Sequence, residues 1–306
     1  MHTINQIALS NSCAKNADLH YTKNHKKGTF RFHKIVDSAL KMTLTCFRIH
    51  AFTQDPFGGN PACVIPLHVW PEDDWMLSMA KEMGVAETAY IVPTPEGEGD
   101  FHLRWFTPDI EMDLCGHATL ASAHVVLRHL IPSMTTVRFS SASGLLTVQD
   151  QEDRRLQMDL PSRPPSPAEL PEPIARALNH QPAEVLKSRD LVLVYPDQKT
   201  IDDIQVNRGE FDQINLGHGG VIVTAPGDDV DFVSRYFTPQ ATILEDPVTG
   251  SAHCSLVPYW NSQTGATEFQ AEQRSKRRGT LECTLSGDRV IIRGHAITFS
   301  EAKLHG

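Results

Sequence analysis

The chain has 306 residues, of which 40% are apolar and 21% charged, as expected for a globular protein with room for two domains. Its net charge is −9, and its body lacks a Lys/Arg stripe interleaved with aromatic residues, which argues against nucleic acid and anionic membranes as partners. Since no apolar run reaches the roughly 18 residues that cross a bilayer, and no signal-peptide core is visible, a small molecule is the expected partner.

Residues 1–41 differ in composition from the rest of the chain. They contain seven Lys or Arg and two Asp, which gives this segment a net charge of +5. Because the whole chain has a net charge of −9, the remainder has a net charge of −14. Three interpretations stay open: a disordered or adventitious leader with the functional start at Met42, an organelle-targeting peptide, and a structural extension. We favour the first, and we expect the segment to add little stability because it can bury little apolar surface.

The next part of the chain alternates predicted strands with one predicted helix. Apolar and polar side chains alternate over 43–52, which is the period of a strand. Over 71–84, apolar residues recur at helical spacing between acidic residues in the first turn and Gly84, which is placed as a C-terminal cap. Further strands are predicted at 87–92, 101–106, 136–141 and 145–150.

A Pro-rich stretch at 159–173 interrupts this pattern and is the best candidate for a linker. Beyond it the same mixture returns, with strands predicted at 190–195, 219–226, 233–237 and 288–294. The sequence therefore favours an α/β protein with two domains of similar plan, 42–160 and 161–306.

The cysteines are scattered along the chain without any CxxC pair, which argues against a zinc or disulfide framework. A reducing compartment follows, and the expected location is the cytoplasm. The six residues are Cys13, Cys46, Cys63, Cys115, Cys254 and Cys283.

One segment occurs twice. FTPDIEMDLCGHATLASAHVVL at 106–127 is repeated in order by FTPQATILEDPVTGSAHCSL at 237–256, and in each copy a Gly turn opens a predicted helix. A helix start offers free backbone N–H groups and favours an anion by about 0.3–1 kcal/mol. Two such starts facing each other, at Gly116 and Gly250, predict a carboxylate site in a cleft between the halves. Pro258 is expected to kink or end the second helix.

Four segments resemble the signature blocks of the phenazine-biosynthesis PhzF-like isomerase family. The resemblance runs from about Met42 to the C-terminus. It implies the diaminopimelate-epimerase-like fold, in which each of two similar domains curls a mixed sheet around a central helix, with the active site between them. It also implies cofactor-independent proton transfer and a homodimer, but it names no substrate. The four segments are AFTQDPFGGNPACVI, AKEMGVAETAYIV, LRWFTPDIEMDLCGHATLASAHVVL and SRYFTPQATILEDPVTGSAH.

The resemblance also implies roles for individual residues. Glu87, at the head of a predicted apolar strand, matches the acid/base glutamate, and partial burial there would raise its pKa and suit it to proton transfer. The substrate-binding positions fall on Gly116, His117, Asp246, Gly250 and Ser251. From the residues alone, Glu87 could also be an exposed strand start, Asp246 a turn residue and Ser251 an N-cap. His50 departs from the Asp that relatives often carry.

Two rival functions remain open. A two-thiol racemase needs a Cys ahead of each Gly turn, but Thr249 replaces the second, so only a one-sided racemase or dehydratase using Cys115 is compatible. A catalytically silent binding protein on this fold is the other alternative. No nucleotide-binding GxGxxG after a strand, GxxxxGK[ST] or HExxH spacing occurs, so we expect neither a metal nor a cofactor.

Overall fold

The computed structural model describes residues 21–24, 29–32, 43–94 and 98–305. Within the predicted leader it gives one antiparallel pair, β1 (Tyr21–Asn24) and β2 (Thr29–Phe32). The rest of that leader lies outside the described residues, so its role stays a prediction. A separate compact body begins at Thr43.

The first half of the body is built on a mixed sheet. Its strands are β3 (Thr43–Ala51), β4 (Asn60–Pro66), β5 (Glu87–Pro93), β6 (Phe101–Phe106), β8 (Thr136–Ser141), β9 (Gly144–Asp150) and β10 (Leu156–Pro161). They lie in this order, and a short strand β7 (Glu111–Met112) pairs with β6. β4 runs parallel to β5 and β6 to β8, while the other neighbours are antiparallel.

The second half repeats this plan. Its strands are β12 (Glu184–Lys187), β13 (Leu191–Val194), β14 (Val221–Pro226), β15 (Phe232–Phe237), β17 (Glu268–Gln273), β18 (Gly279–Ser286) and β19 (Arg289–Gly294), with β16 (Glu245–Asp246) on β15. The parallel pairs are now β13–β14 and β15–β17, at the equivalent places. The two halves therefore share one topology, which confirms the predicted similarity of plan.

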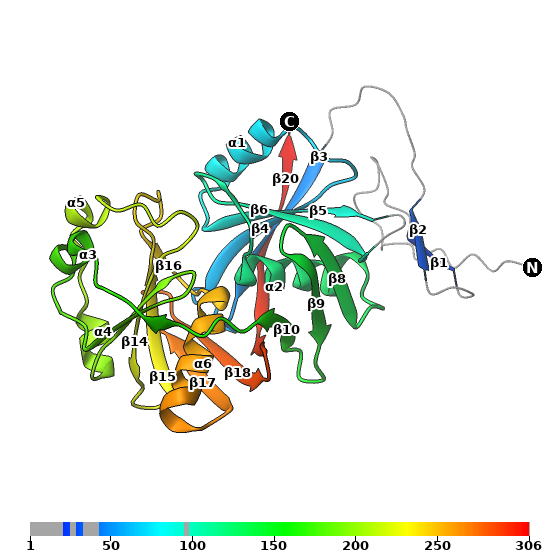
Figure 1. Cartoon of the computed structure of the whole chain (residues 1–306). Coiled ribbons are helices and arrows are strands. Elements are labelled where there is room, and N and C mark those ends of the chain that lie inside the picture. Colours follow the sequence, from blue (N-terminus) through cyan, green and yellow to red (C-terminus); the bar gives the residue numbers. More distant parts are fainter. Residues whose placement is uncertain (1–20, 25–28, 33–42, 95–97, 306) are drawn as a thin grey trace, which may run out of the picture. The chain divides into compact units, whose positions relative to one another are not determined.

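Each half wraps its sheet around one central helix, α2 (Gly116–Val125) or α6 (His253–Thr264) (Figure 1). All ten residues of α2 are buried, since it lies against β3, β4, β5 and β10. The many small side chains of α2 let the surrounding strands approach it closely. A helix that is buried on all sides in this way lies at the centre of its domain. A π-helical turn, Val126–Leu130, continues α2.

The other helices cover the outer faces of the sheets. α1 (Asp73–Met83) buries Met76 and Ala80 against β4 and β5, and Gly84 caps it in the left-handed conformation, as predicted. The short helices α3 (Glu172–Ala177), α4 (Gln198–Asp203) and α5 (Arg208–Phe211) pack in the same way on the second half.

Two strand exchanges connect the halves. β10 pairs with β19, so the two sheets are continuous, and the last strand, β20 (Ala296–His305), returns to pair with β3. In the corresponding place of the second half, β11 (Ser166–Pro167) pairs with β12. The boundaries 42–160 and 161–306 stay a prediction, and Ala296–His305 contribute a strand to the sheet of the first half.

Pro258 was expected to kink or end the second central helix, and it does not end it. α6 continues six residues beyond it to Thr264. A proline leaves the carbonyl four residues earlier without its helical donor. That carbonyl, on Cys254, instead accepts a hydrogen bond of 2.8 Å from the backbone N–H of Arg163, in the connection after β10. The interruption is thereby compensated by a neighbouring segment.

Candidate active site

The two repeated helix starts lie against each other. A Cβ atom added to Gly116 would stand 3.2 Å from Gly250 Cα and 3.3 Å from Ser251 N. Any side chain at Gly116 would therefore push the two starts apart, which explains a glycine at this close approach. The second start is one turn of 3₁₀ helix, Gly250–Ala252, that runs into α6. Both starts line the same pocket.

An ion pair that is also repeated supports each start. Arg104 donates to Glu111 through Nε and Nη2 at 2.6 Å each, and Arg235 donates to Glu245 at 2.7 and 3.1 Å. In both halves the arginine lies on the long strand and the glutamate on the short strand paired with it. These bidentate contacts fix β7 and β16 in place. Glu245 is therefore a structural residue, whereas its neighbour Asp246 faces the pocket.

Glu87 and His117 form a buried pair beside the helix starts. Glu87 is the first residue of β5 and His117 the second of α2, and their Oε2 and Nε2 atoms lie 3.1 Å apart. The side chains are 12% and 2% exposed, respectively. Neither atom has an aligned hydrogen bond to another described residue. The carboxylate oxygen and the ring nitrogen therefore face each other within the protein.

Asn60 links this pair to the second half of the body. Its Nδ2 atom lies 3.0 Å from His117 Nδ1, 2.7 Å from Asp246 Oδ1 and 2.9 Å from the carbonyl of Val248. Thr249 donates to the other oxygen of Asp246 at 2.5 Å. The sequence reasoning missed Asn60 as a site residue, although an Asn between two glycines and a proline was visible in the GGNP turn.

Burial and neighbouring charges set the proton affinities of the site. Burial alone lowers the pKa of His117, but the adjacent Cys115 sulfur and Glu87 carboxylate raise it well above its usual value. Burial, aided by Glu87, raises the pKa of Asp246 to about 6 against the opposing effect of His117. Burial and then Glu87 raise the pKa of Cys115 to about 11, so this side chain is a thiol at neutral pH.

The predicted site residues line one pocket of about 270 Å³, which is of a size for a small metabolite. Those six residues are Glu87, Gly116, His117, Asp246, Gly250 and Ser251. The lining also includes apolar residues, further polar residues and the loop 215–218.

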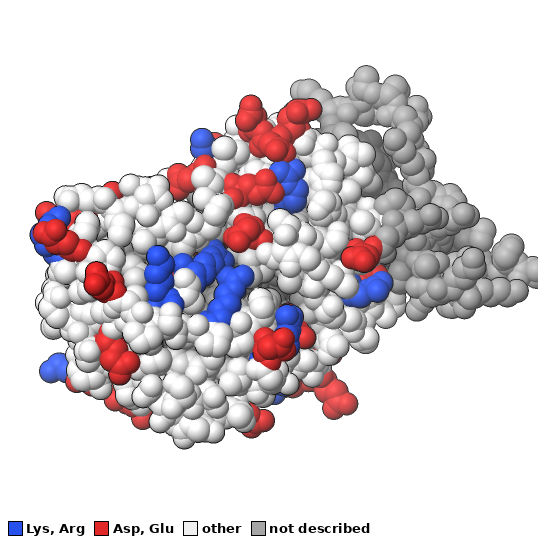
Figure 2. Space-filling model, viewed as in Figure 1, with Lys and Arg blue, Asp and Glu red and all other residues white. Residues whose placement is uncertain are grey.

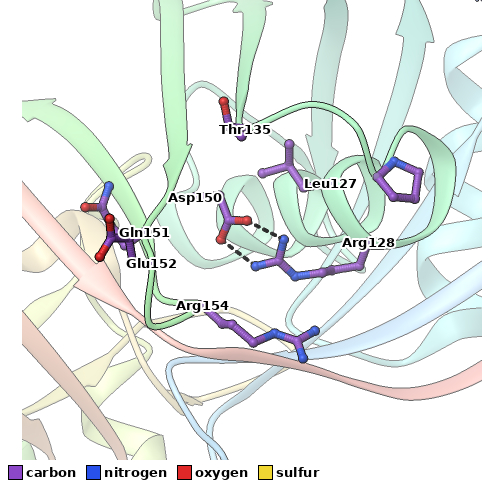
Figure 3. A pocket seen from close by; sticks show the side chains of 8 residues that line it. Leu127, Arg128, Thr135, Asp150, Gln151, Glu152 and Arg154 are labelled. Carbon is purple, nitrogen blue, oxygen red and sulfur yellow. Dashed lines mark hydrogen bonds and ion pairs between the residues drawn. The ribbon is translucent and has the colours of Figure 1, made fainter.

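A larger hollow, of about 560 Å³, lies elsewhere and does not have the features of a reaction site (Figure 3). Its principal charged groups neutralise each other, because Arg128 donates to both oxygens of Asp150 at 2.5 and 2.6 Å. The hollow is open and lies at the end of the π-helical turn and the β9–β10 connection. We assign it no chemistry.

Glu87, Cys115 and His117 also place their ligand atoms within 4.8 Å of one another, a spacing that a metal ion could bridge. Cys115 Sγ, however, lies 3.5 Å from Nδ1 of His117, while Glu87 faces Nε2. Because the sulfur and the carboxylate face different ring nitrogens, one ion at His117 would not meet all three in this arrangement. The group fits a proton-transfer site better than a metal site.

Asp246 provides a test of this electrostatic description. Its pKa is about 6 in the folded protein and 3.8 for an unperturbed side chain, so the folded state binds the extra proton between these values. The resulting stability is present below pH 3.8 and is lost as the pH rises through about 6. Relative to Asp246→Asn, the wild-type protein should lose about 2–3 kcal/mol of unfolding free energy between pH 4 and pH 7. Urea unfolding of both proteins at a series of pH values measures this difference, and a constant difference would contradict the shift.

The fold and the pocket define an epimerase-like protein with its site between two matching halves. The family model described as phenazine biosynthesis-like protein (PhzC-PhzF) matches residues 49–302, and the chain belongs to this family. No helix among the described residues is long and apolar enough to cross a membrane.

Named relatives agree with this assignment. An uncharacterized isomerase of Pseudomonas aeruginosa is 44% identical over 264 residues, which cover 86% of this chain and all of the relative. The human phenazine biosynthesis-like domain-containing protein is 39% identical over 289 residues, covering 86% and 99% of the two chains. These similarities place the chain among the isomerases of the family.

Solved structures show the same fold. A PhzF-family protein of Enterococcus faecalis has a TM-score of 0.79 at 40% identity, with 87% of this chain and all of that chain covered. A hydroxyproline epimerase of Agrobacterium vitis has a TM-score of 0.59 at 10% identity, with 86% and 92% covered, which is a likeness of fold alone. The predicted two-halved epimerase-like fold is confirmed.

Proposed function

We propose that this protein is a cofactor-independent isomerase that moves a proton on a small carboxylate-bearing metabolite, with Glu87 as the general acid and base. The observation that carries this proposal is the buried Glu87–His117 contact of 3.1 Å in the pocket where two helix starts converge. A carboxylate base next to an anion-binding surface is what removal of a carbon-bound proton requires.

The proposed reaction proceeds in two proton transfers. The N–H groups near Gly116 and Gly250 bind the substrate carboxylate, and Glu87 then takes a proton from a nearby carbon. The electron pair of the broken C–H bond shifts into the adjacent unsaturated system. Protonated Glu87 exchanges its proton with solvent in part of the turnovers and then returns a proton to another carbon. His117 holds the Glu87 carboxylate in position, and Asn60, which also bonds to Asp246, contacts the other nitrogen of His117.

The internal repeat favours one base over two. Phe106 and Phe237 begin the two copies of the repeat, and they pair with Thr88 and Val221, respectively. Val221 is therefore the counterpart of Thr88. Gly220, the residue before Val221, is the counterpart of Glu87. A two-base epimerase requires a proton donor on each face of the substrate, whereas the second half offers no such carboxylate at the matching position. A proton shift on one face is therefore favoured over inversion.

The structure gives less support to a reaction that uses Cys115. A catalytic thiol acts as the thiolate, which forms readily only where the pKa is lowered. Cys115 is buried, and its pKa is raised to about 11.

The free thiols of the described cysteines fit the reducing cytoplasm, where we place the protein. The homodimer stays a prediction.

Incubation of the protein with small carboxylates in deuterated water tests the proposal. An isomerase of this kind should place deuterium from solvent on carbon in the substrate or product, as measured by mass spectrometry. A silent binding protein on this fold would bind a ligand without any such exchange. Binding without exchange across a broad set of unsaturated acids would overturn the proposal.

A further inference from the structure

Arg189 lies in the turn between β12 and β13 and forms part of the pocket wall. Among the described residues that line this pocket, it is the one Lys or Arg side chain. The pocket also contains the carboxyl groups of Glu87 and Asp246, so its walls are not uniformly cationic. Figure 2 shows several Lys and Arg side chains near the middle of one face of the molecule, with separate groups of Asp and Glu side chains around them.

The guanidinium group of Arg189 has unused donors. Its Nη2 atom donates to the carbonyl of His218 at 2.6 Å, but Nε and Nη1 are buried without a hydrogen-bond partner among the described residues. Its side chain is only 16% exposed. Leaving buried donors of a charged group unpaired is costly, so such a group points to a ligand that supplies the acceptors.

Nearby carboxylates do not occupy these two donors. Asp113 Oδ1 stands 3.8 Å from Nη2, beyond hydrogen-bond distance, and its side chain is 49% exposed. Oδ1 of Asp190 accepts from Gly220 N at 2.8 Å and from the Tyr236 hydroxyl at 2.9 Å. Arg235, by contrast, is fully paired with Glu245.

Arg189 is also held in position by its surroundings. A Cβ atom on Gly219 would meet the carbonyl oxygen of Arg189 at 2.6 Å, so the loop before β14 packs directly on the Arg189 backbone. The contacts of Asp190 with Gly220 and Tyr236 fix the following residue of the same turn. A preorganised cation with free donors binds an oxyanion without the cost of ordering a long side chain.

We propose that Arg189 binds a second oxyanion of the substrate, a carboxylate or a phosphate, so that the substrate is a small dianion. This inference rests on the proposed function for the first carboxylate, which the helix starts at Gly116 and Gly250 bind. Arg189 then determines specificity, because only a molecule with two acidic groups makes both contacts. The planar guanidinium suits either type of oxyanion.

Calorimetric titration with three probes tests this assignment without any turnover. Butyrate and succinate have the same number of carbon atoms but carry one and two carboxylates, and 3-phosphonopropionate replaces one carboxylate by a phosphonate. The wild-type protein should bind succinate or 3-phosphonopropionate at least about tenfold more tightly than butyrate. Whichever dianion gains more identifies the second group as carboxylate or phosphate.

Arg189→Gln should abolish this preference while the affinity for butyrate changes less than about threefold. Arg189→Lys keeps the positive charge but loses the planar guanidinium with its paired donors. This variant should therefore retain part of the preference for dianions. Arg138→Gln removes an exposed arginine that pairs with Asp100, and as the matched control it should behave like the wild type. Circular dichroism of each variant establishes that it is folded.

Three results would overturn the proposal: no binding of either dianion by the wild type, an unchanged preference in Arg189→Gln, or an equal loss for butyrate and the dianions. The last result would mean that Arg189 holds the single carboxylate itself. If Arg189→Gln fails to fold, Arg189→Lys decides, and a full wild-type preference in that variant would count against the proposal. A failure of proton transfer, by contrast, shows only in deuterium exchange and leaves these affinities unchanged.

Discussion

Glu87→Gln should lower turnover by at least about 10², because a positioned acid/base group usually contributes about 10²–10⁴ in rate. Glutamine keeps the shape of the side chain and removes its basic oxygen. The amide can still face His117, so the affinity for a carboxylate analogue should change far less than turnover does. Steady-state kinetics together with calorimetric binding separate these two quantities.

Neighbouring variants provide the controls for this experiment. Glu82→Gln makes the same substitution on an exposed position of α1 and should leave turnover unchanged. His117→Ala and Asp246→Asn should weaken binding and turnover together, since both residues orient the substrate or the base. The assignment of Glu87 would be wrong if its glutamine variant turned over near-normally, or if that variant lost its fold.

Phe52→Ala should remove about 3–5 kcal/mol of unfolding free energy, as expected for a fully buried aromatic ring. Phe52 is 0% exposed, and its ring lies where Cβ atoms on Gly250 and Gly294 would come within 3.3 and 2.4 Å of it. Its backbone has a φ of 63°, and its N–H donates to the carbonyl of His295 at 2.7 Å. Because the start of the second central helix rests on this ring, carboxylate binding should weaken as well.

Urea unfolding of three variants separates the possible causes. Phe57→Ala removes a ring that is 74% exposed and should cost less than about 0.5 kcal/mol. Phe52→Gly relieves the left-handed backbone and should be less destabilised than Phe52→Ala by up to about 1 kcal/mol. A loss below about 1 kcal/mol for Phe52→Ala would show that the ring is not central to the core.

Local pattern predicted much of this fold. The strand at 43–52, the helix capped at Gly84 and the strand that begins at Glu87 all follow from periodicity and cap chemistry, and the structure has them at β3, α1 and β5. The repeated segment also indicated two matching halves, because the same order of turn and helix recurs in each. These features depend on residues that are close in sequence.

Long-range partners could not be predicted in this way. Asn60 meets Asp246, 186 positions later, and β20 returns to β3 across nearly the whole body. From the sequence, Pro258 could not show that the helix would continue, because the compensating Arg163 N–H that reaches the freed carbonyl lies far away in the chain. Arg189 resembled any other surface arginine in the sequence, and only its unpaired donors in the pocket distinguish it.

The central claim is that Glu87, and not Cys115, takes the proton from the substrate carbon and returns it. The most direct measurement is the rate of deuterium incorporation from solvent into one substrate by the wild type, Glu87→Gln and Cys115→Ala. We predict a loss of at least about 10² for Glu87→Gln and less than about tenfold for Cys115→Ala. The reverse order, with exchange retained in Glu87→Gln and abolished in Cys115→Ala, would contradict the assignment of Glu87.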